Sequence, residues 1–322
     1  MASRYDVLAA SMLACACAAA APARAQQYPE HAITLIAPYQ AGGPTDAAGR
    51  LIGAAMARLL GQQIVVQNVT GAGGTIGTAQ AAEAAPDGYT LLVAGAGTNA
   101  AVEALHVNAG YHPIDSFEAV GLLITSPLVI VGRKDLPAND LGQLIAWLRE
   151  QQENAREGSA GRGSVSHAGC AYLRTLIGTR AKQVSYRGTS QATQDLVAGK
   201  VDYMCNPIAT AVDEAKRGAI KAYAVTSETR SPMLPEVPTT AEAGLPAYRM
   251  RAWYGLMAPK GTPKPIVDRL TQAMSAAMDD PVTVKRFSEL GFDLAPRELR
   301  SPAGFESFIR DEIRLWTRVL GD

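Results

Sequence analysis

The chain has 322 residues, of which 48% are hydrophobic and 6% aromatic, and its 30 basic and 30 acidic side chains give a formal net charge of +0. A neutral chain without a basic stripe does not suit nucleic acid or a membrane surface as a partner. The length is sufficient for two lobes, each with its own hydrophobic core.

Residues 1–25 have the features of a secretory signal peptide. Arg4 is followed by a short apolar stretch and then by the small-x-small sequence ARA, which ends at Ala25. The apolar stretch is shorter than a membrane span requires. We therefore expect cleavage after Ala25 and a mature protein in the periplasm, with lipidation at Cys15 as the alternative.

Predicted strands and helices alternate along the chain. The apolar run 33–39 predicts a strand, and apolar residues at helical spacing over 48–59 predict a helix that ends at Gly61. The alternation continues to residue 95, and a second alternation begins near residue 127. This order predicts an α/β fold with mainly parallel sheets flanked by helices.

The second alternation repeats the arrangement of the first. A Gly/Ser-rich stretch, 157–166, is expected to be a loop leading into a helix over 167–178, which ends in LIG as the first helix ends in LLG. The proline-rich stretch 230–246 is expected to lie on the surface. A strand over 251–261 and three helices complete the chain.

We therefore expect two lobes with a cleft between them. Lobe 1 comprises residues 26–126 and the returning segment 251–322, and lobe 2 comprises residues 127–250. Loops and helix N-termini at the carboxyl ends of the strands then face each other across the cleft, where α/β sheets bind ligands.

One wall of the cleft is predicted by the sequence APYQAGGPTDAAGR, residues 37–50. Gly42 and Gly43 permit a tight turn, and Pro44 favours a helix start. The free N–H groups of such a start bind anions, although an ordinary strand-to-helix turn is the alternative. Asp46 would repel a carboxylate, so we expect it to accept backbone N–H groups, order a water or recognise an ammonium group.

The sequence shows no catalytic or metal-binding motif. It lacks HExxH and CxxC, and its histidines are scattered, at His31, His106, His112 and His167. Ser166 and His167 are neighbours on a predicted helix and point about 100° apart, which disfavours a nucleophile–base pair. GAGTNA, 95–100, matches a dinucleotide motif weakly, and a Gly-rich turn is the simpler interpretation. We therefore expect no metal, no cofactor and no enzymatic activity.

The remaining polar residues near the predicted cleft suit the binding of a small carboxylate. They offer several N–H and O–H donors and few fixed charges, and two helix N-termini add partial positive charge. Tyr39, Tyr186 and Trp253 favour an aromatic or longer-chain acid or else belong to the core. The candidate ligand-binding residues are Tyr39, Gly42, Gly43, Asp46, Thr98, Asn99, Ser164, Ser166, His167, Tyr186 and Asn206.

The chain resembles the Bug-type solute-binding proteins, which are the extracytoplasmic receptors of tripartite tricarboxylate transporters. The resemblance extends from about residue 28 to the C-terminus. It depends on five sequences in order: APYQAGGPTDAAGR, VVQNVTGAGGTIGTAQAAEAAPDGYTLL, VSYRGTSQATQDLVAGKVDYM, VPTTAEAGLP and APKGTPKPIVDRL.

The resemblance implies a monomeric two-lobe Venus flytrap that closes over a small organic acid and delivers it to the membrane subunits of the transporter. Docking on a sensor kinase is the alternative, and a secreted enzyme would need a nucleophile–base pair that the sequence lacks. The family's P-G-G-x-x-D loop corresponds to Gly42, Gly43 and Asp46, where backbone groups and waters hold a ligand carboxylate. The family's serine-containing loop corresponds to Ser164 and Ser166. At the positions of Ala41 and Thr70 the family usually has proline, so we expect these two turns to be less rigid in this chain.

Two cysteines, Cys170 and Cys205, remain after the expected cleavage. In an oxidising compartment we expect them to form a disulfide, as the resemblance to a bridged subgroup of the family also implies. Two buried free thiols are the alternative.

Overall fold

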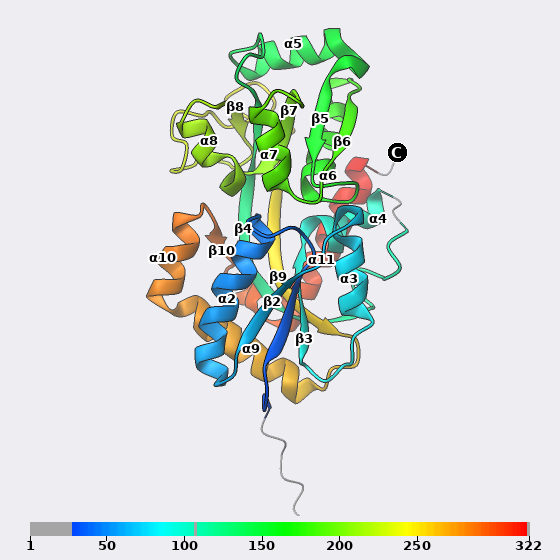
Figure 1. The fold of residues 1–322 in the computed structure, drawn as a ribbon, viewed down its shortest axis with the longest axis vertical. Coiled ribbons are helices and arrows are strands. Elements are labelled where there is room, and N and C mark those ends of the chain that lie inside the picture. Colours follow the sequence, from blue (N-terminus) through cyan, green and yellow to red (C-terminus); the bar gives the residue numbers. More distant parts are fainter. Residues whose placement is uncertain (1–27, 106–107, 321–322) are drawn as a thin grey trace, which may run out of the picture.

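The computed structural model describes residues 28–105 and 108–320, so the expected signal peptide and His106 lie outside the described residues. The described residues form two α/β lobes, drawn one above the other in Figure 1. Two long strands, β4 and β9, run through the junction between the lobes. The two-lobe α/β fold is the one that the sequence predicts.

Lobe 1 is built on the strand order β2-β1-β3-β9-β4, with β1 parallel to both β2 and β3. Its strands are β1 (Ile33–Ala37), β2 (Ile64–Asn68), β3 (Thr90–Gly95), β9 (Arg251–Pro259), the first part of β4 (Phe117–Arg133) and the short β10 (Asp293–Leu294). Its helices are α2 (Pro44–Leu60), η2 (Ala72–Gly74), α3 (Thr75–Ala82), η3 (Gly97–Ala101), α4 (Val102–Ala104), α9 (Lys264–Asp279), α10 (Pro281–Glu289), η6 (Arg297–Arg300) and α11 (Pro302–Leu320).

Lobe 2 continues the sheet from β4 through β7, β5 and β6, and β8 also pairs with β4. Its further strands are β5 (Arg156–Ser159), β6 (Lys182–Ser185), β7 (Tyr203–Pro207) and β8 (Ile220–Val225). Its helices are α5 (Leu141–Gln151), η4 (Gln152–Asn154), α6 (Val165–Ile177), α7 (Thr189–Val197), η5 (Ile208–Thr210) and α8 (Val212–Lys216).

Strand β4 joins the lobes because it changes partners along its length. Its residues up to Pro127 pair with β9 in lobe 1, whereas those from Leu128 onward pair with β7 and β8 in lobe 2. The chain returns at Arg251, which pairs with Pro127 at the same level. The partner change therefore falls between Pro127 and Leu128, within a strand of 17 residues.

Two details of the predicted strands need correction. The sheet is mixed, because β4 and β9 run antiparallel to their neighbours and only the outer strands of each lobe are parallel. The stretch 157–166, expected to be a loop throughout, begins inside strand β5. The sequence does not indicate this strand, because glycine and glutamate are uncommon in strands. Its burial within lobe 2 stabilises it.

The repeated helix arrangement is confirmed. Helix α2 begins at Pro44 after the N-cap Gly43, and α6 begins after the N-cap Ser164. Both helices end on a glycine in the left-handed conformation, Gly61 and Gly178, whose N–H bonds the last turn. The N-termini of both helices therefore lie at the carboxyl ends of the preceding strands, facing the junction.

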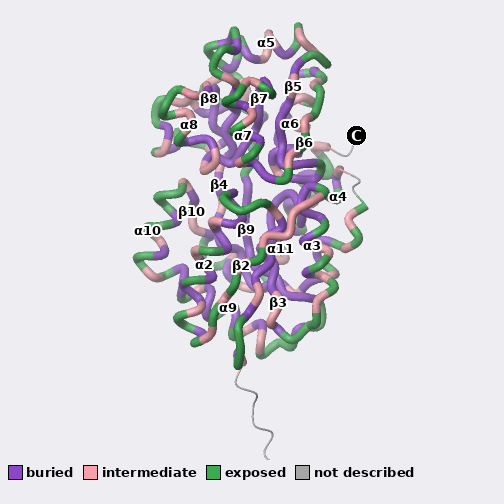
Figure 2. Tube along the Cα trace, viewed as in Figure 1, coloured by how far each residue is buried: buried purple, intermediate pink, exposed green. Residues whose placement is uncertain are grey.

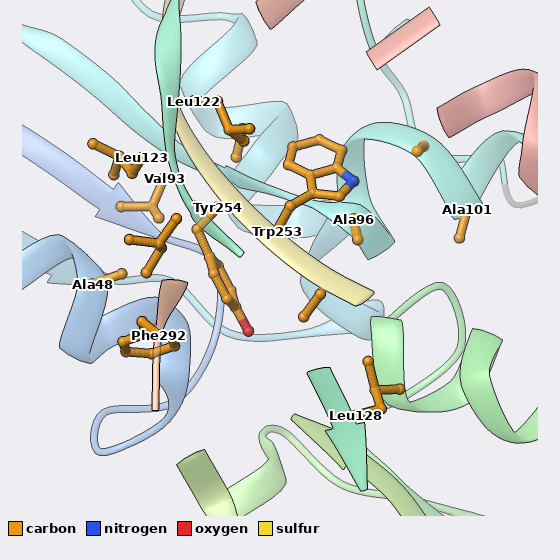
Figure 3. Close-up of a cluster of buried hydrophobic side chains, with 14 of the residues drawn as sticks. Ala48, Val93, Ala96, Ala101, Leu122, Leu123, Leu128, Trp253, Tyr254 and Phe292 are labelled. Carbon is orange, nitrogen blue, oxygen red and sulfur yellow. The ribbon is translucent and has the colours of Figure 1, made fainter. Parts of the chain in front are cut away.

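The core follows the central strands. Buried segments of both lobes gather along β4, β9 and their neighbours (Figure 2). At the junction, Trp253 packs edge-on against Phe305 and Phe308, and Tyr254 packs edge-on against Phe292. Figure 3 shows Trp253 and Tyr254 on β9 beside side chains from several elements of lobe 1.

The structure corrects the expected disulfide. Cys170 on α6 and Cys205 on β7 are free, fully buried thiols. They lie within hydrogen-bonding reach of each other, and burial raises the pKa of the Cys170 thiol. Packing as small apolar side chains in the core of lobe 2 accounts for their proximity without a covalent bond.

Among residues 28–105 and 108–320, no helix is both long enough and apolar enough to span a bilayer. Within the same ranges, no group of three or more histidine, cysteine or acidic side chains is arranged to hold a metal ion.

Gly255 on β9 tests how tightly the junction is packed. An added Cβ there lies 2.2 Å from Phe305 Cζ and 2.9 Å from the Gly121 carbonyl oxygen. We expect Gly255→Ala to lower the free energy of unfolding by about 1–3 kcal/mol in urea titrations, because α11 must shift away from the sheet. The control Gly142→Ala, at an exposed position of α5, adds helix propensity without a comparable clash and is expected to be neutral or stabilising. Equal effects of both changes would contradict this account.

Candidate ligand-binding site

A cavity of about 30 Å³ lies between the lobes, where helix N-termini from both lobes meet. It is enclosed by residues of lobe 1, of lobe 2 and of the crossing strand β9. The lining residues are Tyr39, Gln40, Gly43, Pro44, Thr45, Val93, Gly95, Ala96, Gly97, Ala160, Ser164, Val165, Ser166, Gly188, Thr189, Pro207, Trp253 and Tyr254.

The cavity lining contains no charged side chain, but it contains the first residues of four helices. These helices are α2, η3, α6 and α7, which begin after Gly43, Ala96, Ser164 and Gly188. The N–H groups of a helix's first turn have no partner within the helix, and the N-terminus carries about half a positive charge. The cavity is therefore electropositive through backbone dipoles, without the cost of burying an ion.

Two predicted serines form the lobe 2 wall. The Ser166 hydroxyl accepts a hydrogen bond from Ala160 N–H at 3.0 Å, and the Ser164 hydroxyl caps α6 by accepting from His167 N–H at 3.3 Å. The two hydroxyl oxygens lie 3.2 Å apart. The two hydroxyls are therefore hydrogen-bonded to each other, so one donates its proton to the other and the proton of the second is left for a ligand.

Aromatic side chains form the lobe 1 wall. Tyr39 donates its hydroxyl proton to Gly73 O at 2.8 Å, and Trp253 donates its indole N–H to Glu312 Oε2 at 3.0 Å. The Tyr254 hydroxyl points away from Leu122 (Figure 3). Burial raises the pKa of both Tyr39 and Tyr254 above the ordinary value, so both side chains are neutral donors over the whole physiological pH range. This wall offers apolar area with a few neutral polar groups.

Asp46 supports the first loop from outside the cavity lining. Its carboxylate accepts hydrogen bonds from Gly42 N–H at 3.0 Å, from Arg50 at 2.9 Å and from Asn68 at 3.0 Å. Burial tends to raise the pKa of the Asp46 carboxyl, but these hydrogen bonds outweigh it and hold the pKa below its ordinary value. Asp46 thus accepts a backbone N–H group, which is one of the three roles expected from the sequence. The Arg50 guanidinium balances its negative charge.

Thr98, Asn99 and His167 are not among the residues that line the cavity. Thr98 donates to Asn99 Oδ1 at 2.8 Å, and the Asn99 amide spans Gly95 N–H and Pro113 O. These bonds hold the start of η3, whose Gly97 does line the cavity. His167 similarly accepts from Gly163 N–H at 3.3 Å, in the loop before α6.

Tyr186 and Asn206 are also outside the lining. Tyr186 donates to Asp195 Oδ2 at 2.9 Å, and Asn206 donates to Thr193 Oγ1 at 3.2 Å. Among the predicted residues, Tyr39, Gly43, Ser164 and Ser166 are the ones that line the cavity, and Gly42 holds Asp46 behind it.

Sequence reasoning missed several lining residues, notably Gln40, Thr189 and Tyr254. Thr189 had a usable signal, because Gly188 precedes a helix just as Gly43 does. Tyr254 had none, because an apolar strand does not show in its sequence which side chains reach a cavity.

The lobes touch directly around the cavity. Gln40 N–H donates to Arg187 O at 3.3 Å, and the Ser190 hydroxyl donates to Gly42 O at 3.0 Å. The Gly73 backbone approaches Arg162 so closely that an added Cβ would lie 1.7 Å from its carbonyl oxygen. The structure is therefore a closed arrangement of the two lobes.

His167 makes stability depend on pH. Burial, together with the nearby Arg174 and Arg162, lowers its pKa from 6.5 to about 4. Between these values the unfolded chain binds a proton that the folded protein does not, so the free energy of unfolding rises with pH. The contribution is complete above about pH 6.5 and is lost as the pH falls toward 4, with a maximum of roughly 3 kcal/mol.

The measurement is urea unfolding between pH 4 and 7.5 for the wild-type protein and for His167→Gln, which keeps a polar side chain but cannot titrate. We expect the substitution to flatten the slope between pH 4 and 6.5. An unchanged slope would show that His167 is not the titrating group.

Known proteins are similar to this chain in sequence and in fold. A family model described as the tripartite tricarboxylate transporter family receptor matches residues 48–322. A UPF0065 protein of Agrobacterium vitis is 38% identical over 295 residues, which cover 92% of this chain and 85% of that protein. The structure of MatC from Rhodopseudomonas palustris with bound malate has a TM-score of 0.88 at 41% identity and covers 91% of this chain and 100% of that one.

A second Rhodopseudomonas palustris protein, solved with adipate, has a TM-score of 0.85 at 29% identity, with 91% of this chain and 97% of that chain covered. These matches confirm the family and the two-lobe fold that the sequence resemblance implies. The chain belongs to the receptor family of the tripartite tricarboxylate transporters.

Proposed function

We propose that this receptor captures a small organic carboxylate between its lobes in the periplasm and delivers it to the membrane subunits of a tripartite transporter, without catalysis. The observation that supports this most strongly is the convergence of four helix N-termini on a cavity without charged side chains. Such a site attracts a negative charge, and it offers no fixed carboxylate that would repel one.

The energetics suit a carboxylate ligand. Each helix N-terminus contributes up to about 2 kcal/mol to holding an anion in a partly buried site. Three of them, together with a hydrogen bond from the paired Ser164 and Ser166 hydroxyls, can supply the roughly 8 kcal/mol of a micromolar complex. The similar proteins solved with malate and adipate support the same ligand class.

Ligand exchange requires the lobes to part. A cavity of about 30 Å³ has room for about two water molecules, whereas a dicarboxylic acid is several times larger. Opening about the crossing strands admits the ligand, and closure returns the helix N-termini to it. A partner that contacts both lobe rims can then distinguish the closed form from the open form.

The first experiment is calorimetry of the mature protein with malate, adipate and a panel of mono-, di- and tricarboxylates. We expect one carboxylate to bind at one per chain, with a micromolar dissociation constant, and the matching methyl ester or amide to bind at least tenfold more weakly. The ester and the amide should bind more weakly because they lack the negative charge that the helix N-termini stabilise. Equal binding of the uncharged analogue, or no binding by any acid in the panel, would overturn the proposed function.

Gly73→Ala tests whether closure is needed for binding. An added Cβ there meets the Arg162 carbonyl across the lobe junction, so the closed form must open by an ångström or more. We expect the dissociation constant of the bound carboxylate to rise at least tenfold in calorimetry.

The matched control is Gly61→Ala. Gly61 has nearly the same positive φ, +72° against +67°, and nothing lies within 4 Å of its added Cβ. It therefore reproduces the backbone strain of the substitution without the contact between lobes. A similar loss of affinity in both variants would assign the effect to strain instead of closure.

A further inference from the structure

A second groove adjoins the ligand cavity at the lobe junction. It has a volume of about 920 Å³, and its lining includes Gln40 and Gly73 from lobe 1 and Arg162, Tyr186 and Arg187 from lobe 2. Gln40 lines both this groove and the ligand cavity. The groove therefore adjoins the cavity at Gln40, and we call it the mouth groove.

The mouth groove has an unbalanced charge. Its lining contains two guanidinium groups, those of Arg162 and Arg187, and no carboxylate. Among the described residues, neither arginine takes part in an ion pair, and the one hydrogen bond from these side chains runs from Arg162 to Leu105 O at 3.4 Å. Both side chains are exposed. Their charges consequently act on the solvent in front of the cleft.

Each of the two arginines lies in lobe 2 just before the N-cap of a helix. Arg162 lies two residues before the N-cap Ser164 of α6, and Arg187 lies one residue before the N-cap Gly188 of α7. Each cavity-lining helix of lobe 2 is thus preceded by a cation outside the cavity. In lobe 1, by contrast, the Arg50 guanidinium is paired with the Asp46 carboxylate.

We propose that the mouth groove is an encounter site for anionic ligands, at which Arg162 and Arg187 attract the ligand to lobe 2 before the lobes close on it. The inference rests on the proposed function and adds a capture step to it. The cavity itself holds the ligand through neutral donors, whose attraction is short-ranged. Two unpaired charges at the mouth extend that attraction into solvent over about 8 Å at physiological ionic strength.

The arginines and the cavity residues therefore affect different rate constants, those of ligand association and of ligand dissociation. Charges that steer an encounter raise the association rate and make it dependent on salt. They affect dissociation little, because neither arginine lines the cavity in which the ligand is enclosed. Contacts inside the cavity, by contrast, determine how long the ligand stays bound.

The test is stopped-flow kinetics with malate and adipate, followed by tryptophan fluorescence, because Trp253 lines the cavity. We expect Arg162→Gln combined with Arg187→Gln to lower the association rate constant about three- to tenfold at about 20 mM ionic strength. The dissociation rate constant is expected to stay within twofold of the wild-type value. At about 500 mM ionic strength the two proteins are expected to associate at the same rate.

Two further variants make the test specific. Replacing both arginines by lysine keeps the charge and is expected to restore the association rate and its salt dependence. Arg269→Gln removes an exposed arginine that contacts Leu59 O, near the far end of α2. The 17 residues of α2 place this site about 25 Å from its N-terminus, beyond the screening length, so the association rate should not change.

The outcomes separate this inference from the proposed function. Binding with an unchanged association rate in the double glutamine variant would overturn the encounter site and leave the carboxylate receptor intact. A slower association that is accompanied by a much faster dissociation would also overturn it, because the arginines would then hold the bound ligand. If the wild-type protein binds no carboxylate, both proposals fail.

Discussion

The pairing of β4 with β9 is the constraint on which the rest of the structure depends. Strand β4 runs through both lobes, and β9 returns the chain beside it at the level of Pro127 and Arg251. Because one strand belongs to both sheets, the carboxyl ends of the parallel strands in each lobe face the same junction. The helices that follow those strands must then begin there, which brings the N-termini of α2, η3, α6 and α7 together around one cavity.

Collecting backbone dipoles at the junction avoids a difficulty that charged side chains would create. A buried guanidinium or ammonium group has to be desolvated, and it remains uncompensated whenever the ligand is absent. Helix N-termini carry partial charges that the fold already contains, and the open form exposes them to water. The charged residues near the site are kept in other roles: Asp46 with Arg50 shapes the first loop, and Arg162 and Arg187 lie at the mouth.

Closure also depends on the absence of a side chain at two glycines of the junction, Gly73 and Gly97. The backbones of the two lobes come close together where Gly73 meets Arg162 and where Gly97 meets the start of α6, and at both places a Cβ would collide with backbone atoms. A glycine at each position allows the backbones themselves to come into contact. Gly73 and Gly97, from the Gly-rich sequences 71–77 and 95–100, are therefore points of contact between the lobes.

The sequence by itself determined the α/β alternation, the helix start at Pro44, and the glycines that end α2 and α6. It placed the start of α6 at His167, two residues after the observed start at Val165. These features depend on neighbours within about one turn of the chain, through apolar spacing, capping and backbone freedom. The motifs also identified the family, because five of them follow in one order along the chain.

Only the tertiary structure decided which polar residues line the cavity. Ser164 and Ser166 reach it, whereas Thr98, Asn99 and Asn206, equally polar, turn inward to hold loops and helix starts. Trp253 and Tyr254 join the lining because β9 crosses at that level, and Cys170 and Cys205 are neighbours because α6 packs on β7. The physical reason is that burial, side-chain direction and contact between lobes depend on residues from separate elements, such as Gly42 and Ser190, whose distances no local pattern encodes.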